Sequence, residues 1–332
     1  MNYLHMPPKN LLALPILFVV FLGVTPDSGY AQGVVTSNRN PLQIATLHWY
    51  AANQTTQLQT GKFPSGIAFD GANIWVVNHG DNTVTKLRAN DGENLGTFAV
   101  GTGPYAIAYD GANVWVTDAE SNAVTKLQAS DGATLGTFAV GTNPSAIVFD
   151  GDHIWTANAG SNTLTKLRAS DGSILGTFNV GNNSQGLAFD GRDIWIANSG
   201  TVNSPGTTVS KVSSNGKVLG TFTVGSSPLA MAFDGANIWV ANNASNTVSK
   251  VRVGDGAVLG DFSVGSLPNG IAFDGANIWV ANSSSNNVSK VRALDGKLLG
   301  TFTVGSFPVN GVAFDGANIW VTNFFSNSVS KM

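Results

Sequence analysis

The residues best suited to chemistry in this 332-residue chain are a few ionisable groups that interrupt its repetition. His79 and Asp81 lie close together, and Asp118 and Glu120 lie close together one repeat later. Equivalent positions elsewhere carry mostly Asn, Ala, Ser and Gly. Carboxylates and an imidazole on one surface can bind a divalent cation such as Mg²⁺ or Ca²⁺. These four residues are a candidate metal or binding subsite; the alternative is a solvated loop edge.

A second candidate surface is aromatic and neutral. Phe324 and Phe325 are adjacent in a predicted loop, which favours contact with a partner or glycan unless the rings fold back onto the protein. A loop enlarged around Pro205 is also unlike its counterparts. Seven residues are predicted to line the mouth of a central axis, with Tyr105, Gln185 and Asn269 as ligand contacts, and none is His, Asp or Glu: Ser65, Tyr105, Ser145, Gln185, Leu229, Asn269 and Val309.

The elements that position these residues come from one repeated unit. An Asp-Gly pair preceded by an aromatic residue recurs seven times, at spacings of 40, 40, 40, 44, 40 and 41 residues, and tryptophan follows each aspartate by five residues. A period near 40 is typical of solenoids and propellers. The aspartates and tryptophans are Asp70, Asp110, Asp150, Asp190, Asp234, Asp274 and Asp315, and Trp75, Trp115, Trp155, Trp195, Trp239, Trp279 and Trp320.

The content of one unit decides between these architectures. Residues 268–305 contain four short runs rich in Val, Ile, Phe, Trp and Thr, separated by Asp-Gly turns and a short middle hairpin. No helical period is present to cover either face of such a sheet. The sequence therefore predicts an all-β, seven-bladed β-propeller of four-stranded antiparallel blades, in which each blade buries both faces against its neighbours.

The ring is predicted to close with a strand from the N-terminal side. The last copy stops after its third strand, and residues 55–64 align without gaps to the fourth-strand segment 299–308. Closure hides the strand edges that an open array would expose. Residues 44–50 also align to a third strand, 288–294, and compete with residues 328–332 for one place; the sequence leaves that pairing open.

Residues that recur in every blade are predicted to be structural, because every blade needs them. The tryptophans are expected in the core, since burying one removes about 150 to 250 Å² from water. Turn aspartates are expected to bond their own backbone, and Asp193 to be solvated. Recurring lysines are expected to pack their stems between blades with the ammonium group in water: Lys86, Lys126, Lys166, Lys211, Lys250, Lys290 and Lys331.

Composition limits the function and the compartment. A net charge of -3 and 11% charged residues argue against a nucleic-acid partner, and the absence of cysteine excludes disulfides. Lys9, an apolar run at 11–24 and small residues before position 32 predict a signal peptide at 1–31, without a stable membrane span. The expected product is a periplasmic or secreted monomer, with an N-terminal segment at 32–54 and the propeller at 55–332.

The strand motifs resemble a known family. Trp-Val-Thr-Asn at 320–323 and Trp-Val-Ala-Asn at 239–242 and 279–282 resemble the motif of YVTN-repeat propellers, with Trp in place of Tyr. A looser similarity is to streptogramin lyases and lactonase-type propellers. The YVTN resemblance implies a propeller and no particular activity.

Two functions follow as expectations. The first is an exported, non-catalytic binding or scaffold module without a cofactor, recognising an envelope protein, a glycan or a small molecule on one face. The second is a metal-dependent lyase or lactonase-like enzyme using His79, Asp81, Asp118 and Glu120. Against it, no histidine follows His153, so a late-blade catalytic histidine is missing. A quinone oxidoreductase is disfavoured, because the predicted axial lining has no charged residue.

Overall fold

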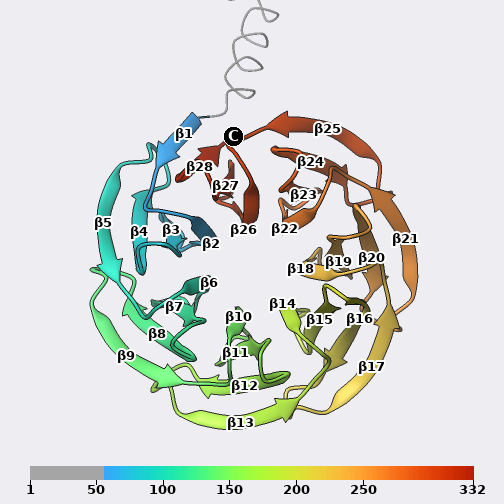
Figure 1. Ribbon diagram of the computed structural model, residues 1–332, viewed down its shortest axis with the longest axis horizontal. Coiled ribbons are helices and arrows are strands. Elements are labelled where there is room, and N and C mark those ends of the chain that lie inside the picture. Colours follow the sequence, from blue (N-terminus) through green and yellow to red (C-terminus); the bar gives the residue numbers. More distant parts are fainter. Residues whose placement is uncertain (1–55) are drawn as a thin grey trace, which may run out of the picture. The chain divides into compact units, whose positions relative to one another are not determined.

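The computed structural model describes residues 56–332, which form seven four-stranded antiparallel sheets and no helix. The sheets stand around a ring as the blades of a β-propeller (Figure 1). The predicted fold class is confirmed. Within residues 56–332 there is accordingly no helix able to cross a membrane. The predicted signal peptide, the segment 32–54 and the open pairing of residues 44–50 lie outside the described residues.

Each blade contributes one strand to each of four concentric positions. The innermost strands are β2 (Pro64–Phe69), β6 (Pro104–Tyr109), β10 (Pro144–Phe149), β14 (Ser184–Phe189), β18 (Pro228–Phe233), β22 (Pro268–Phe273) and β26 (Pro308–Phe314). The second strands are β3 (Asn73–Asn78), β7 (Asn113–Asp118), β11 (His153–Asn158), β15 (Ile194–Thr201), β19 (Asn237–Asn242), β23 (Asn277–Asn282) and β27 (Ile319–Asn323). The third strands are β4 (Thr83–Arg88), β8 (Ala123–Gln128), β12 (Thr163–Arg168), β16 (Ser204–Val212), β20 (Thr247–Arg252), β24 (Asn287–Arg292) and β28 (Ser328–Lys331). The outermost strands are β5 (Asn94–Ala99), β9 (Thr134–Ala139), β13 (Ile174–Asn179), β17 (Val218–Thr223), β21 (Val258–Ser263), β25 (Leu298–Thr303) and β1 (Thr56–Gln59).

The ring has two different faces. Blades are numbered one to seven in chain order: blade one consists of β2 to β5, and blade seven consists of β26, β27, β28 and β1. The Asp-Gly turns between first and second strands, and those between third and fourth strands, lie on what we call the turn face. The hairpins between second and third strands lie on the opposite side with the links from one blade to the next, and we call this the hairpin face.

Blade seven joins residues from both ends of the described range. Its sheet has the order β1-β28-β27-β26, and Thr56 pairs with Lys331 while Gln59 pairs with Ser328. Leu58 of β1 packs against a core that includes Trp320 and Val329. The outermost strand of this blade therefore comes from residues that precede the first blade, at the position predicted from the alignment.

The turn aspartates and the tryptophans form one local structure. In blade one, Oδ1 of Asp70 accepts the backbone N–H groups of Ala72 and Asn73, and Oδ2 accepts the indole N–H of Trp75 at 2.8 Å. Burial alone would raise the pKa of Asp70, but the hydrogen bonds from Trp75 and Asn73 hold it below its usual value. The same indole contact recurs in all seven blades, so the aspartate orients the buried ring as well as the turn.

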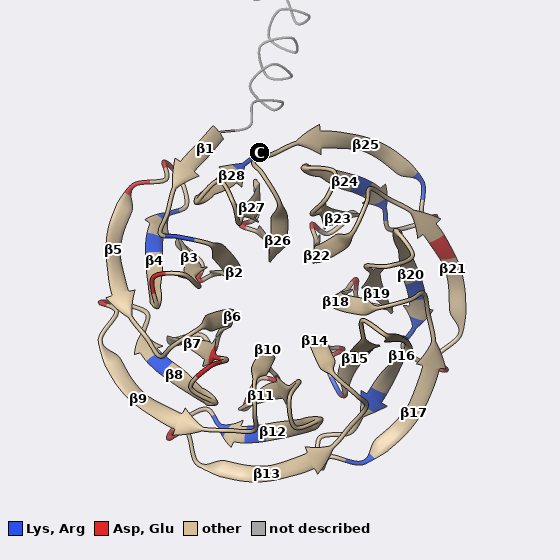
Figure 2. Cartoon of the chain, viewed as in Figure 1, with Lys and Arg blue, Asp and Glu red and all other residues tan. Residues whose placement is uncertain are grey.

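Most of the recurring lysines link neighbouring blades, and the prediction that their ammonium groups reach water is wrong for the buried ones. Each ammonium group lies about 5 Å from the centre of its blade's tryptophan ring, as Lys126 does at 4.8 Å over Trp115. Lys126 is only 6% exposed and donates to the carbonyl oxygens of Ala169 and Ser170 in the next blade, at 2.7 and 3.2 Å. The ammonium groups of the buried lysines Lys86, Lys126 and Lys250 thus satisfy backbone acceptors of the next blade instead of reaching water, whereas Lys166 makes its contact at an exposed position. Figure 2, in which Lys and Arg positions are blue, shows these positions on the third strands spread around the ring.

We expect Lys126→Met to lower the free energy of unfolding by about 1 to 3 kcal/mol, because two carbonyl groups at the blade interface lose their donor. Methionine keeps the length of the stem, so chemical denaturation measures mainly the missing ammonium group. Lys166→Met is the matched control, since Lys166 donates to one carbonyl only, that of Ser214 at 3.0 Å, in an exposed contact. Equal losses in the two variants would contradict this assignment.

Blade four departs from the pattern at Asp193, which was predicted to be solvated. Asp193 stands where five other blades have asparagine and blade three has His153, and it is 4% exposed. Its carboxylate lies 3.1 Å from the ammonium group of Lys211, which also lies 3.2 Å from Asp190. The prediction was wrong because a sequence does not show that the lysine of the third strand reaches this turn. The cation balances two buried carboxylates.

Candidate functional site

The predicted contacts Phe324 and Phe325 belong to an aromatic cluster on the hairpin face. Phe324 stacks on Phe63 with ring centres 4.9 Å apart, and Phe325 lies 4.9 Å from Phe307. Phe324 and Phe325 are themselves 5.3 Å apart in an edge-to-face arrangement. Phe325 is 58% exposed and Phe63 is 39% exposed. The cluster joins the hairpin of blade seven to the links before β26 and β2, and part of it faces solvent.

The backbone under this cluster is strained. Phe63, Phe307 and the neighbouring Leu267 have φ values of 53°, 54° and 53°. In the other blades the same left-handed position is held by Gly103, Asn143, Asn183 and Ser227. A left-handed residue with a bulky side chain costs about 1 to 2 kcal/mol, a cost that glycine avoids and asparagine tolerates better. The three apolar side chains are held at a conformational cost and still face solvent in part.

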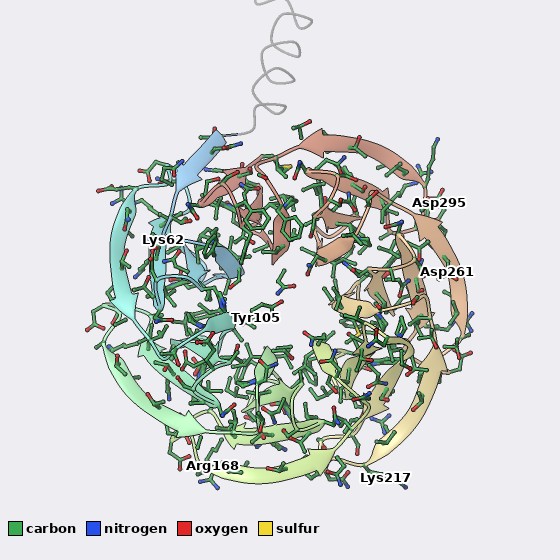
Figure 3. All side chains as sticks on the ribbon, viewed as in Figure 1. Lys62, Tyr105, Arg168, Lys217, Asp261 and Asp295 are labelled. Carbon is green, nitrogen blue, oxygen red and sulfur yellow. The ribbon has the colours of Figure 1, made fainter. Side chains whose placement is uncertain are left out.

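The aromatic row continues toward the axis through His79 and Tyr105. The His79 ring lies 6.5 Å from Phe324 and 6.3 Å from Tyr105, and its Nδ1 lies 3.1 Å from the carbonyl oxygen of Pro104. Tyr105 extends from the inner strand toward the centre of the ring (Figure 3). Burial raises the pKa of Tyr105, an effect that its hydrogen bond with Asn310 opposes. Five phenyl or phenol rings and one imidazole thus form a continuous row.

The axial residues are mostly as predicted, with one correction. Ser65 donates to the carbonyl oxygen of Tyr105 at 2.9 Å, and Gln185 donates to Asn183 at 2.7 Å. Asn269 has a buried Oδ1 without a hydrogen-bond partner. In blade seven the axial residue is Asn310 and not Val309, because strand β26 has one residue more than the other inner strands and its register shifts there. Val309 is 7% exposed and packs into the blade.

The four predicted metal ligands occupy different environments. Asp81 accepts the backbone N–H of Lys62 at 2.7 Å and lies 3.8 Å from its ammonium group, while Glu120 is exposed beside Gly103. Asp118 is fully buried at the end of β7, where it accepts the hydroxyl of Thr125 at 2.6 Å. Within residues 56–332 no three His, Asp or Glu side chains gather closely enough to bind one metal ion. The structure does not bring these four together as one subsite.

Sequence reasoning found Phe324 and Phe325 but missed Phe63 and Phe307. A signal for them was present, because both stand directly before the proline that begins an inner strand, where four other blades have Gly, Asn or Ser at the corresponding position. The sequence alone does not show that Phe63 and Phe307 have left-handed backbone, or that they lie beside the hairpin of blade seven. Hydrogen bonds hold each residue there: the N–H of Phe63 binds Asn327, and that of Phe307 binds Asn286.

Solved structures with the same fold include enzymes. A streptogramin B lyase structure is 16% identical and covers 84% of this chain and 96% of that chain, with a TM-score of 0.71. A Kuenenia stuttgartiensis hydrazine synthase is 20% identical, covering 83% of this chain and 96% of that chain, with a TM-score of 0.72. A catalytically inactive virginiamycin B lyase from Staphylococcus aureus with quinupristin is 16% identical, covering 84% and 98%, with a TM-score of 0.71.

These likenesses establish the fold and not an activity, since the identities are low. The predicted similarity to streptogramin lyases is confirmed at the level of the propeller. No protein-family model and no curated protein sequence matches the chain. The resemblance to YVTN-repeat propellers therefore stays a prediction.

Proposed function

We propose that this chain is an exported binding module whose contact surface is the aromatic cluster of the hairpin face: Phe63, Phe307, Phe324 and Phe325. The observation that carries the proposal is the pair of strained phenylalanines. Phe63 and Phe307 stand in left-handed backbone where four other blades have Gly, Asn or Ser, and they gather with the two loop phenylalanines at one place on the ring. Conformational strain that the fold itself does not need supports a role in recognition.

The chemistry of the surface limits what it binds. Phe325 and Phe63 present apolar ring surface, while the charged groups nearby, Lys62 and Asp81, already pair with each other. Exposed aromatic clusters of this kind receive apolar side chains of a protein, the C–H face of a sugar, or an apolar small molecule. His79 and Tyr105 add polar groups at the inner end of the row.

The test separates binding from folding. We expect the double variant Phe63→Asn, Phe325→Ser to lose at least about tenfold in affinity for a ligand selected from peptide and glycan arrays, a change of about 1.4 kcal/mol. Its free energy of unfolding should stay within about 1 kcal/mol of the wild type, because relief of the left-handed phenylalanine offsets the lost ring packing. Binding is measured by calorimetry and stability by urea denaturation.

The matched control is Leu294→Asn, which removes a side chain that is 83% exposed on the turn face. This variant should bind the selected ligand as the wild type does. Wild-type affinity in the double variant, or an equal loss in Leu294→Asn, would remove the aromatic cluster from the binding surface.

An enzyme similar to the streptogramin lyases is the second candidate, favoured by the shared fold and by His79 beside Tyr105 near the axis. It predicts cleavage of quinupristin, the compound in one of the similar structures, in the presence of Mg²⁺ or Ca²⁺. Loss of that cleavage in His79→Gln, with stability unchanged, would favour the enzyme. Absence of cleavage in the wild type would leave the binding module as the function.

A further inference from the structure

The enlarged hairpin of blade four forms a wall of a surface cavity of about 530 Å³. Nine residues, 199–207, separate the paired Asn198 and Thr208, whereas four residues, 243–246, separate the equivalent pair Asn242 and Thr247 in blade five. Gly200, Ser204, Pro205 and Gly206 of the longer hairpin line the cavity. The feature that makes blade four different from its neighbours therefore also shapes this cavity.

The lining of the cavity is polar and uncharged. Its hydrogen-bonding side chains are three amides and four hydroxyls: Asn179, Asn182, Asn198, Ser204, Thr208, Ser210 and Thr221. Four other hollows in the described ring each include at least one Asp, Lys or Arg side chain. Short apolar surfaces from Val180, Pro205 and Val218 complete this lining.

One buried polar atom in the lining lacks a partner. The amide N–H₂ of Asn198 donates to the hydroxyls of Thr208 and Ser210, at 3.1 and 2.9 Å, but its Oδ1 accepts no hydrogen bond. The equivalent oxygens of Asn78 and Asn323 in blades one and seven accept backbone N–H groups at 3.0 Å, whereas those of Asn242 and Asn282 in blades five and six are unpaired like that of Asn198. Asn198 is 6% exposed and its Oδ1 lies against Gly181, so this acceptor is held out of bulk water inside the wall of the cavity.

The hairpin is held in a defined shape. A Cβ on Gly206 would lie 2.0 Å from the carbonyl oxygen of Asn198, and one on Gly200 would lie 2.2 Å from the nitrogen of Gly206. No other residue fits this backbone crossing. Asn183, in the link before β14, donates to the carbonyl oxygen of Gly200 at 2.5 Å. The wall is thus tied to the ring and preorganised, which lowers the entropy lost on binding.

We propose that this cavity is a binding site for a neutral carbohydrate, one or two sugar rings in size. An ionised ligand would lose hydration without meeting an opposite charge, and a purely apolar ligand would leave amides and hydroxyls unpaired. Sugar hydroxyls donate and accept, so they match the amides and hydroxyls of the lining, among them Ser210 and Thr221, whose hydroxyl groups lie 3.3 Å apart. Ligand sites of about 300 to 1,000 Å³ are usual for small molecules.

The probes are cellobiose, maltose and N,N′-diacetylchitobiose, with sodium glucuronate as the charged comparison, and binding is followed by calorimetry and saturation-transfer NMR. We expect at least one neutral disaccharide to bind with a Kd of about 1 mM or tighter. Replacing residues 199–207 by the short Asn-Ala-Ser-Asn hairpin of blade five, residues 243–246, should weaken it at least about tenfold. Thr221→Val should weaken it about fivefold, by loss of one hydroxyl.

The controls separate this site from the aromatic cluster. Thr177→Val makes the same change at the equivalent place in blade three, paired with Thr165 as Thr221 is with Ser210, and should leave binding unchanged. Phe325→Ser should also leave it unchanged, so the two proposals can fail independently. No binding by any neutral disaccharide, equal binding of glucuronate, or wild-type affinity in both the short-hairpin and Thr221→Val variants would overturn the proposal.

Discussion

A variant that lacks residues 32–59 should lose at least about 5 kcal/mol of unfolding free energy and aggregate on concentration. It lacks β1 (Thr56–Gln59), so β28 becomes an unpaired edge. It also loses the half-buried Leu58, which packs with Trp320 and Val329. Removing a fully buried leucine costs about 2 to 5 kcal/mol, so Leu58 contributes toward the lower end of that range. The strand hydrogen bonds to β28 add to this loss. Urea denaturation and light scattering measure the two effects.

The comparison variant lacks residues 32–54 and keeps all of β1. We expect its free energy of unfolding to equal that of the chain without a deletion. If both deletions reduce stability equally, the effect belongs to residues before β1 and not to closure of blade seven. If neither reduces it, the pairing of β1 with β28 contributes little and the prediction is wrong.

Asp118→Asn should stabilise the protein by about 1 to 3 kcal/mol at pH 8. Six blades have a buried asparagine at the end of the second strand, and blade two alone has this aspartate. Burial raises the pKa of Asp118 to about 6, against the opposing effect of the Thr125 hydroxyl, and its Oδ1 has no hydrogen-bond partner. A shift of about two pH units corresponds to about 3 kcal/mol as an upper figure.

The effect of Asp118→Asn on the free energy of unfolding should depend on pH. The native pKa of Asp118 lies above the ordinary value of 3.8, so protonation favours the folded state. In the wild type, protonated Asp118 contributes its full share of the free energy of unfolding below pH 3.8. This contribution is lost as the pH rises through the native pKa of about 6. The gain from Asp118→Asn should therefore be large at pH 8 and small near pH 4. Asp81→Asn, at an exposed carboxylate, should show no such gain. A gain for Asp118→Asn that does not vary with pH would contradict the assignment.

The fold was predictable because its signals repeat. A turn signal and a tryptophan recur about every 40 residues, so errors at one strand are corrected by the others. The buried positions of Lys126 and Asp193 were not predictable, because the partners of Lys126 come from the next blade and the partner of Asp193 comes from the next strand of its own blade. The register shift that makes Asn310 axial was hidden for a related reason: one extra residue can be placed at several points in an alignment.

The candidate sites were likewise predictable only in part, because some of their residues come together only in the folded ring. Phe324 and Phe325 were visible as adjacent aromatics, but Phe63 joins them from the far end of the described sequence through ring closure. Asp118 was grouped with exposed acids, although its place in the strand repeat corresponds to a buried asparagine in every other blade. Departures from the repeat were the right residues to examine, but burial and side-chain direction had to come from the structure.

The pairing of β1 with β28, which closes blade seven, also determines how the ring responds to mechanical force. Thr56 lies opposite Lys331 at one end of the antiparallel pair, and Gln59 lies opposite Ser328 at the other. Tension applied between Thr56 and Lys331 peels the two strands apart, loading one pair of residues at a time instead of shearing all four together. In thermal unfolding the contacts are shared around the whole ring. Under this force the ring instead opens at one place, between β1 and β28, and the residue pairs separate one after another.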